Sequence, residues 1–226
     1  LDAALARAGT AKGAAVADMG AGAAHLAIEL ARRGFDVQAV EPNANMRAHG
    51  VARTKDMRVK WHDAVMEDAP IAARSVALVT YGSSFGVADR DATLKEAARV
   101  LGDGGHVLCV FNHRDLDDPL QAEIEAYIRS EQPAFDHGPR RKDQGPAIDA
   151  TGLFGAVERF EARIVHRVEP AKWVEAWASH ATLARQTGAR FPEIVAGIGR
   201  IVAKRGAAPF DVPYFTRAWL APLVRR

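Results

Sequence analysis

The sequence contains a single cysteine and no long apolar run. Cys109 lies within the apolar segment 107–111, so it cannot form an intramolecular disulfide and is expected to be buried. No grouping of cysteine and histidine has the spacing of a zinc site, and we therefore expect no metal. No apolar stretch approaches the roughly 20 residues that a membrane-spanning helix needs. These absences exclude a disulfide scaffold, a zinc module and a transmembrane protein, and they favour a cytoplasmic protein with no membrane partner.

Neither sign of charge is in clear excess. Lys and Arg number 30, Asp and Glu number 28, and the formal net charge is +2. Binding to a phosphate backbone needs a dense basic face, so nucleic acid is not an expected partner. Apolar residues make up 48% of the chain, which is enough for a sizeable core. We expect a single domain over residues 1–226, working as a monomer or a homodimer.

The first half of the chain alternates short apolar runs with amphipathic segments. The spacing predicts strands over residues 14–19, 36–40, 57–61, 75–80 and 106–111, and helices over residues 2–10, 25–33, 45–53 and 91–101. The strands are continuously apolar, which is typical of a parallel sheet covered by helices on both faces. Such a sheet binds ligands at the carboxyl ends of its strands, so the residues just after each strand are the functional candidates.

The second half has a different pattern. It predicts helices over residues 119–130, 171–187 and 191–205, and strands over residues 158–168 and 213–221. No internal repeat and no low-complexity linker separates the two halves. We expect residues 1–111 to hold a cofactor and residues 112–226 to form the acceptor side, with the inserted helices as a lid. The sequence begins at Leu1 rather than Met, and we expect further residues upstream.

The loop after the first predicted strand, Asp18-Met19-Gly20-Ala21-Gly22, is suited to a nucleoside cofactor. In such a site the loop must turn sharply, and a bulky ligand must come close to its backbone. Glycine permits both because it has no Cβ atom. Glu41 follows Gly20 by 21 residues, at the end of the second strand. A carboxylate there can accept both hydroxyls of an adenosine ribose. The alternative is a purely structural turn, in which Asp18 and Glu41 cap a helix and a turn.

A dinucleotide cofactor is the competing interpretation of this loop. Its fingerprint needs a third glycine for close helix–strand packing, and that position is occupied by His25. Asp18 would repel a pyrophosphate, whereas it suits a zwitterionic amino-acid tail. S-adenosylmethionine (SAM) has such a tail, so SAM is the expected cofactor and S-adenosylhomocysteine the expected product. An NAD-dependent enzyme stays as a rival.

Five segments in order resemble the motifs of class I SAM-dependent methyltransferases of the type 11/25 group. Residues 16–26 and 40–46 resemble the glycine loop and the acidic loop, and His62-Asp63-Ala64 resembles the segment after strand three. Residues 75–80 and 99–105 resemble strand four and the turn before strand five. The resemblance implies a Rossmann-like α/β fold with a seven-stranded, mostly parallel sheet, one reversed edge strand and helices on both faces.

The resemblance also implies a set of cofactor contacts. Asp63 and the backbone of Ala64 would read the adenine edge, and the residues after strand four would lie near the reacting methyl group. The cofactor-binding residues expected on this basis are Asp18, Gly20, Ala21, Gly22, Glu41, Pro42, Met46, Asp63, Ala64, Thr80, Tyr81 and Gly82.

Acceptor-side candidates follow strands four and five and lie on a late helix. Ser83 and Phe85 come after strand four, where an aromatic ring can line a sulfonium, with loop packing as the alternative. His113 and Arg114 follow strand five, and His113 is the candidate general base. Its alternative is a hydrogen bond within the following turn.

Two further groups of residues have both a functional and a simpler structural interpretation. Trp173, Trp177 and His180 fall at i, i+4 and i+7, which predicts one helical face lining an acceptor pocket or packing on the sheet. Of these, Trp177 and His180 are the substrate-binding candidates. Arg140-Arg141-Lys142 is expected to be a solvated loop, or else to attract an anionic acceptor.

The sequence therefore predicts a methyltransferase (EC 2.1.1.-) that transfers the SAM methyl group to an O or N nucleophile of a small-molecule acceptor. The resemblance to the ubiquinone and small-metabolite branch favours a small acceptor over protein or nucleic acid. Because the catalytic base is not identified, a SAM-binding protein without transferase activity stays as the alternative.

Overall fold

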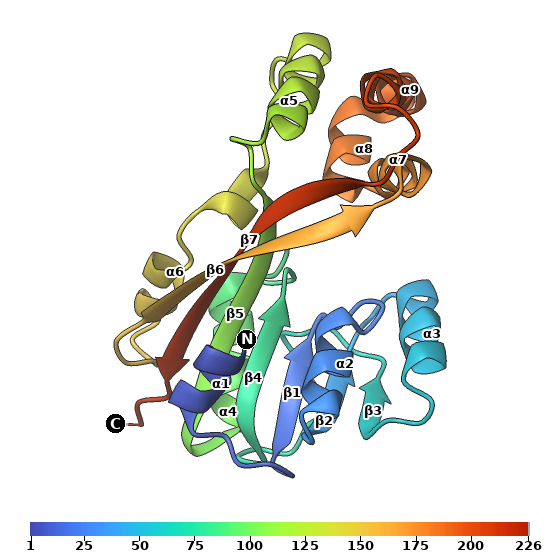
Figure 1. The fold of residues 1–226 in the computed structure, drawn as a ribbon. Coiled ribbons are helices and arrows are strands. Elements are labelled where there is room, and N and C mark those ends of the chain that lie inside the picture. Colours follow the sequence, from blue (N-terminus) through green and yellow to red (C-terminus); the bar gives the residue numbers. More distant parts are fainter. Residues whose placement is uncertain (226) are drawn as a thin grey trace. The chain divides into compact units, whose positions relative to one another are not determined.

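The computed structural model describes residues 1–225, which form alternating helices and strands (Figure 1). In chain order the elements are α1 (Asp2–Ala8), β1 (Ala15–Met19), α2 (His25–Arg32), β2 (Asp36–Val40), α3 (Ala44–Arg53), β3 (Val59–His62), β4 (Val76–Gly82), α4 (Arg90–Val100), β5 (Leu101–Arg114), α5 (Pro119–Glu131), η1 (Gly138–Arg141), α6 (Gly145–Asp149), β6 (Glu158–Val168), α7 (Pro170–Ala178), α8 (Ala181–Thr187), η2 (Gly188–Arg190), α9 (Phe191–Ala203) and β7 (Phe210–Pro222). The first four strands lie within two residues of the predicted bounds, because each is a continuous apolar run.

The strands form one seven-stranded sheet of order β3-β2-β1-β4-β5-β7-β6. The pairs from β3 to β5 are parallel, and β7 is antiparallel. The expected α/β class and strand number are confirmed, but the prediction that the reversed strand lies at the edge is wrong. β7 lies inside the sheet because it carries buried residues such as Val212 and Leu220, whereas β6 has no fully buried residue and takes the edge.

β5 is longer than predicted because its pairing includes an irregularity. Val76 pairs with Leu101 and Leu78 pairs with His106, so the segment 102–105 bulges out of the ladder between them. Gly104 adopts a positive φ of 73° in this bulge. The turn expected before strand five is therefore an interruption inside the strand.

Alternate residues of the central strands supply two separate apolar clusters. On one side, Ala17 and Val79 pack in a cluster that includes Leu94 of α4. On the other side, Val16 and Leu78 pack in a cluster that includes residues of α1 and α2. Because side chains alternate across a strand, these clusters lie on opposite faces of the sheet. The carboxyl ends of β1, β2 and β4 are thereby held together at one edge, where the glycine loop begins.

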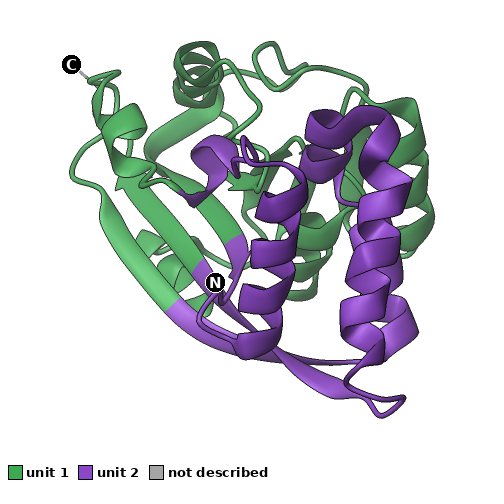
Figure 2. Cartoon of the chain, turned by 90° about the horizontal axis from the view of Figure 1, so that it is seen from above, with its two compact units in different colours: residues 1–111, 142–161, 217–226 green, residues 112–141, 162–216 purple. Residues whose placement is uncertain are grey.

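The chain divides into two compact units (Figure 2). Unit 1 contains residues 1–111, 142–161 and the segment from Arg217 onward, and unit 2 contains residues 112–141 and 162–216. The boundary after Phe111 coincides with the predicted start of the acceptor-side half. Part of that half returns to unit 1, since β5, β6 and β7 each contribute residues to both units. The lid role of the inserted helices stays a prediction.

Unit 2 has its own apolar core, formed by α5, α7, α8 and α9. Its buried members include Ile124, Trp173, Leu183 and Ile198. The single helix predicted over 171–187 is wrong, because α7 ends at Ala178 and α8 begins at Ala181. The side chain of His180 caps α8 by accepting a hydrogen bond from the backbone N–H of Leu183 at 3.1 Å.

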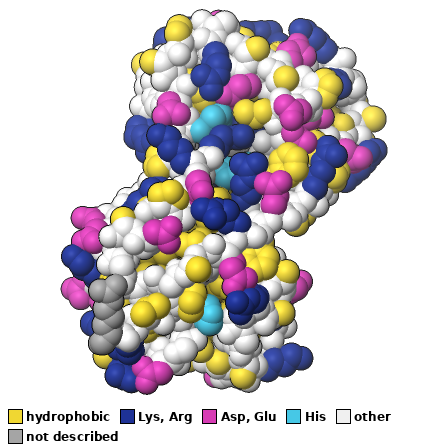
Figure 3. All heavy atoms as spheres, turned by 90° about the vertical axis from the view of Figure 1, so that its left-hand side faces the viewer, with side chains coloured by type: hydrophobic (Ala, Val, Ile, Leu, Met, Phe, Trp, Pro, Cys, Tyr) yellow, Lys and Arg dark blue, Asp and Glu magenta, His cyan; other side chains and the backbone are white. Residues whose placement is uncertain are grey.

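The face drawn in Figure 3 shows no separation of charge. Acidic and basic side chains are interspersed over the face drawn in Figure 3. Within residues 1–225, no helix is both long enough and apolar enough to cross a bilayer. The same residues contain no group of three or more His, Cys, Asp or Glu side chains placed to hold a metal ion.

Candidate functional site

The loop between β1 and α2 requires glycine at Gly20. This residue has a φ of +69°, and a Cβ atom built on it would lie 2.6 Å from the Cβ of Ser84. The Ser84 hydroxyl donates a hydrogen bond to the Met19 carbonyl at 2.5 Å, which holds the two loops together. Gly22 and Ala24 also have positive φ values, of 55° and 70°. Ala24 thus adopts the left-handed conformation that glycine favours.

Asp18 is a buried carboxyl group at the end of β1. It pairs in register with Thr80 of β4, whose hydroxyl donates a hydrogen bond to Oδ1 at 2.9 Å. The other oxygen, Oδ2, is buried and has no hydrogen-bond partner among the described residues. Burial raises the pKa of Asp18 from 3.8 to about 7, and the hydrogen bond from Thr80 offsets only part of that rise. A cationic donor at Oδ2 would restore the ionised form.

Glu41 connects the end of β2 to the glycine loop. Its Oε2 accepts a hydrogen bond from the Gly22 backbone N–H at 2.8 Å, and its Oε1 accepts one from the Asn43 N–H at 2.9 Å. The residue is buried. Each carboxylate oxygen has a second lone pair, so Glu41 can accept two further hydrogen bonds from vicinal hydroxyls. Sequence reasoning identified the carboxylate but not its role in holding Gly22.

The carboxylate that follows β3, Asp63, is held in an ion pair. Arg47 of α3 donates to both oxygens of Asp63, at 2.9 and 2.7 Å. Arg47 also donates to the carbonyl oxygen of Glu41 at 2.8 Å, so it connects the ends of β2 and β3. Asp63 is largely exposed, Met46 is exposed at 43% and Ala64 is half-buried. The adenine role of Asp63 stays a prediction, and Arg47 is a positioning residue that the sequence did not reveal.

The aromatic residue near the end of β4 and the one in the loop that follows belong to the core. Tyr81 is completely buried and its hydroxyl donates to the Thr93 carbonyl at 3.0 Å. Phe85 is also completely buried, with its ring centroid 5.2 Å from that of Tyr81. Both rings pack in the core, and the predicted cofactor contact of Tyr81 and acceptor contact of Phe85 stay predictions. Ser83 has a φ of +63°, and Gly82 lies against the Leu26 side chain.

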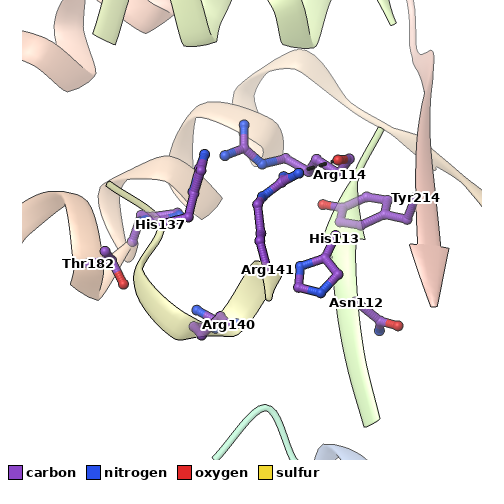
Figure 4. A pocket seen from close by; sticks show the side chains of 9 residues that line it. Asn112, His113, Arg114, His137, Arg140, Arg141, Thr182 and Tyr214 are labelled. Carbon is purple, nitrogen blue, oxygen red and sulfur yellow. Dashed lines mark hydrogen bonds between the residues drawn. The ribbon is translucent and has the colours of Figure 1, made fainter. Parts of the chain in front are cut away.

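Unit 2 contains a pocket of about 200 Å³ that brings together distant parts of the sequence (Figure 4). Its lining is entirely polar or cationic and consists of Asn112, His113, Arg114, His137, Arg140, Arg141, His180, Thr182 and Tyr214. No Asp or Glu lines this pocket among the described residues. The expectation that Arg140 and Arg141 belong to a solvated loop therefore does not hold, since both side chains line the pocket, whereas Lys142 is exposed.

Arg114 is buried against an aromatic ring instead of a carboxylate. Its Cζ atom lies 3.8 Å from the ring centroid of Trp177, and its Nη1 donates to Gln121 at 3.2 Å. Within residues 1–225 it makes no ion pair. Burial lowers the pKa of Arg114 to about 10, and the nearby Arg141 cation contributes to the lowering.

His180 extends this stack. Its ring lies 5.2 Å from that of Trp177 and nearly parallel to it, at 20°. Burial lowers the pKa of His180 to about 4, with further lowering by Arg114 and Arg140, so the ring is neutral at pH 7. Because Nδ1 accepts from the backbone, we assign the ring proton to Nε2, which makes that atom a donor. Three predicted substrate residues, Arg114, Trp177 and His180, are thus in one stack.

His113 lies next to Arg114 on β5 and lines the same pocket, where its imidazole is labelled in Figure 4. It is buried, with 6% of its surface exposed. His137 on the other side bonds through Nε2 to Glu125 at 2.9 Å. The pocket therefore contains His113 as a candidate base, and its catalytic role stays a prediction.

The glycine loop and the strands around it match a known family model. Residues 16–105 match the model described as a methyltransferase domain. The chain is also 32% identical over 93 residues to the ubiquinone/menaquinone biosynthesis C-methyltransferase UbiE of Caulobacter vibrioides. That match covers 40% of this chain and 36% of the relative, so the matched segment spans about a third of the relative's length.

Solved structures share the fold over the whole chain. One from Anaeromyxobacter dehalogenans, described as a type II methyltransferase, has a TM-score of 0.73 at 19% identity and covers 100% of this chain and 97% of its own. A Haemonchus contortus phosphoethanolamine N-methyltransferase 2, solved with phosphomonomethylethanolamine and S-adenosylhomocysteine, has a TM-score of 0.57 at 20% identity and covers 99% of this chain and 52% of its own. At these identities the likeness establishes the fold alone.

Proposed function

Because this chain carries a methyltransferase domain of the class I, SAM-dependent type over residues 16–105, we propose that it transfers the methyl group of SAM to a small-molecule acceptor. The observation that carries the proposal is the buried oxygen Oδ2 of Asp18, which lies beside the glycine loop without a hydrogen-bond partner. A buried acid with one unsatisfied oxygen is costly, and the α-ammonium of SAM is a donor of the right charge.

The other residues of the loop fit the rest of this cofactor. Glu41 retains lone pairs for the ribose hydroxyls while it holds the Gly22 N–H. Gly22 leaves the backbone open to a ligand, since it carries no Cβ atom and an added one would meet only the Met46 side chain at 3.4 Å. The adenine contact of Asp63 and Ala64 is part of the proposal. When bound, SAM supplies an electrophilic methyl group on a sulfonium.

The role of the chain's own residues is to bind, orient and exclude water. Correct positioning of acceptor and methyl group can account for much of the rate, because effective molarity is a large term in such transfers. We propose that His113 accepts the proton that an O or N nucleophile loses, as its imidazole lines the unit 2 pocket. Ser83 belongs to the proposed acceptor contacts, and the enzyme works as a monomer or a homodimer.

The proposal also names the kind of atom that is methylated. The relative from C. vibrioides is named a C-methyltransferase, and the one from H. contortus an N-methyltransferase. We favour O or N, because such an acceptor needs only one base, whereas an unactivated carbon needs stabilisation of a carbanion. Mass spectrometry of the methylated product from an acceptor panel decides between the three atoms.

The proposal is tested by calorimetric titration of SAM into the wild type and into Glu41→Gln. We expect SAM to bind the wild type and to bind Glu41→Gln about 10-fold to 100-fold more weakly, because a hydrogen bond to a charged group is worth roughly 1.5–3 kcal/mol. Asp103→Asn is the control, since Asp103 is an exposed acid paired with Arg74. Equal affinity in wild type and Glu41→Gln contradicts the cofactor site. Binding without release of S-adenosylhomocysteine across the panel favours a SAM-binding protein without transferase activity.

A further inference from the structure

The pocket of unit 2 concentrates positive charge. Arg114, Arg140 and Arg141 line it, and the structure provides no acidic lining residue among those it describes. Arg141 donates a hydrogen bond from Nη2 to the carbonyl oxygen of Arg114 at 3.1 Å, which brings the two cations together. Figure 4 shows both guanidinium groups on the same side of the pocket. An anion in the pocket would be attracted by both cations.

Arg114, which is buried, and Arg140, which is half-buried, each lack an ion pair within the described residues. Arg114 is 8% exposed and holds one hydrogen bond, to Gln121, besides its contact with the Trp177 ring. Arg140 has a buried Nε with no hydrogen-bond partner, and neither residue makes an ion pair within the described chain. Burial lowers the pKa of Arg140 as well as that of Arg114. Buried guanidinium groups are costly without an acceptor, so this arrangement is completed by a ligand of opposite charge.

The acids near the pocket offset only part of this charge. Glu125 accepts hydrogen bonds through Oε1 from His137 at 2.9 Å and from Arg129 at 3.0 Å, and its charge raises the pKa of Arg114 against the larger lowering by burial. Asp115 pairs with Arg163 at 3.3 Å. The remaining lining groups add donors, since Nε2 of His180 carries the ring proton and Thr182 and Tyr214 carry hydroxyls.

We propose that this pocket binds an oxyanion, a phosphate or carboxylate group, and that the methyl acceptor carries that group. The planar guanidinium fork matches both anions and binds them through paired hydrogen bonds. The volume of about 200 Å³ is far larger than the roughly 10–15 Å³ that one water molecule needs, so the anion is one end of a larger molecule. Only the identification of this anion with the methyl acceptor rests on the proposed function.

The test is calorimetric titration of the full chain at low ionic strength with inorganic phosphate in one arm and succinate in the other. We expect at least one of them to bind the wild type, and its affinity to fall tenfold or more in the double variant Arg140→Gln/Arg141→Gln. Arg185→Gln, an exposed arginine of α8, is the matched control and is expected to stay within twofold of the wild type. Tighter binding of phosphate identifies a phosphate ester, and tighter binding of succinate identifies a carboxylic acid.

Each remaining outcome decides the question. If the double variant does not fold, as judged by its thermal unfolding, single Arg140→Gln carries the same prediction with about a threefold loss. Failure of both anions to bind the wild type, or unchanged affinity in the arginine variants, overturns the oxyanion pocket. SAM affinity measured on the same samples separates the two proposals. Oxyanion binding without SAM binding supports the oxyanion pocket and contradicts the proposed function. SAM binding without oxyanion binding supports the cofactor site and overturns the oxyanion pocket.

Discussion

The glycine loop of unit 1 contains a buried acid, and the pocket of unit 2 contains a buried cation. Neither charged group has an ion-pair partner among the described residues. In the loop, Asp18 is a buried acid whose Oδ2 has no partner among the described residues. In the pocket, Arg114 is a buried cation that makes no ion pair within residues 1–225. Burying an unpaired charge destabilises a protein, so natural chains retain one mainly where a ligand completes it. The comparison suggests that each unit binds a group of the complementary charge.

The largest effect is expected from a Cβ atom at Gly20. Gly20→Ala places that atom 2.6 Å from the Cβ of Ser84, in a residue whose φ is +69°. We expect a loss of roughly 2–5 kcal/mol in the free energy of unfolding, from the clash and the left-handed backbone together. Denaturant titration measures this loss, and SAM binding is expected to be lost too.

Gly9→Ala provides the matched control for that substitution. Gly9 has a similar φ of +64° but nothing within 4 Å of a built Cβ atom. It should cost only about 1–2 kcal/mol, which is the backbone part of the effect. Equal losses in the two variants would show that close approach of the β4 loop does not explain the glycine at position 20.

A smaller effect of opposite sign is expected from removing the buried acid. A pKa raised from 3.8 to about 7 corresponds to roughly 4 kcal/mol of folding free energy lost by the ionised form. Asp18→Asn should therefore raise the free energy of unfolding at neutral pH by up to about 4 kcal/mol while weakening SAM binding at least tenfold. If Asp18→Asn is less stable than the wild type at neutral pH, the ionised Asp18 carboxyl does not destabilise the folded protein, and the prediction is wrong.

The same carboxyl predicts how stability depends on pH. In the unfolded chain Asp18 ionises near its ordinary value of 3.8, whereas in the folded protein it stays protonated up to about pH 7. Between these values the folded protein binds more protons, so the contribution of Asp18 to stability falls as pH rises and is constant above about 7. The difference in unfolding free energy between wild type and Asp18→Asn should change by at most about 1.4 kcal/mol per pH unit in that window. A flat difference would place the pKa of Asp18 near its ordinary value.

The smallest expected effect is a difference in how salt changes ligand affinity at the two sites. Raising NaCl from about 50 mM to about 500 mM shortens the Debye length and adds a competing anion, so binding of inorganic phosphate or succinate in unit 2 should weaken several-fold. SAM affinity should stay within about twofold, because Asp18 is fully buried and chloride does not compete for it. Parallel titrations at the two salt concentrations measure both. Equal sensitivity of the two ligands would remove the contrast between the sites.

The sequence predicts the first unit well and the second poorly, for reasons visible in single residues. Val16 and Leu78 lie in continuous apolar runs, and such runs identify buried strands without knowledge of their neighbours. The helix predicted over 171–187 fails at His180, because a side-chain cap outweighs the helical spacing of the tryptophans. The burial of the Tyr81 and Phe85 rings could not be predicted, because local spacing cannot tell a core residue from one that lines a site.

What the sequence by itself determined is the cofactor loop, because its determinants are local. Gly20, Gly22 and Asp18 lie within five consecutive residues, and Glu41 ends the next strand, so parallel pairing of β1 with β2 suffices to bring them together. Only the tertiary structure decided the cationic pocket, because Arg114, Arg140 and His180 are far apart in the chain and meet through the packing of unit 2. Burial is what gives such residues unpaired charge, and burial is a property of the folded chain.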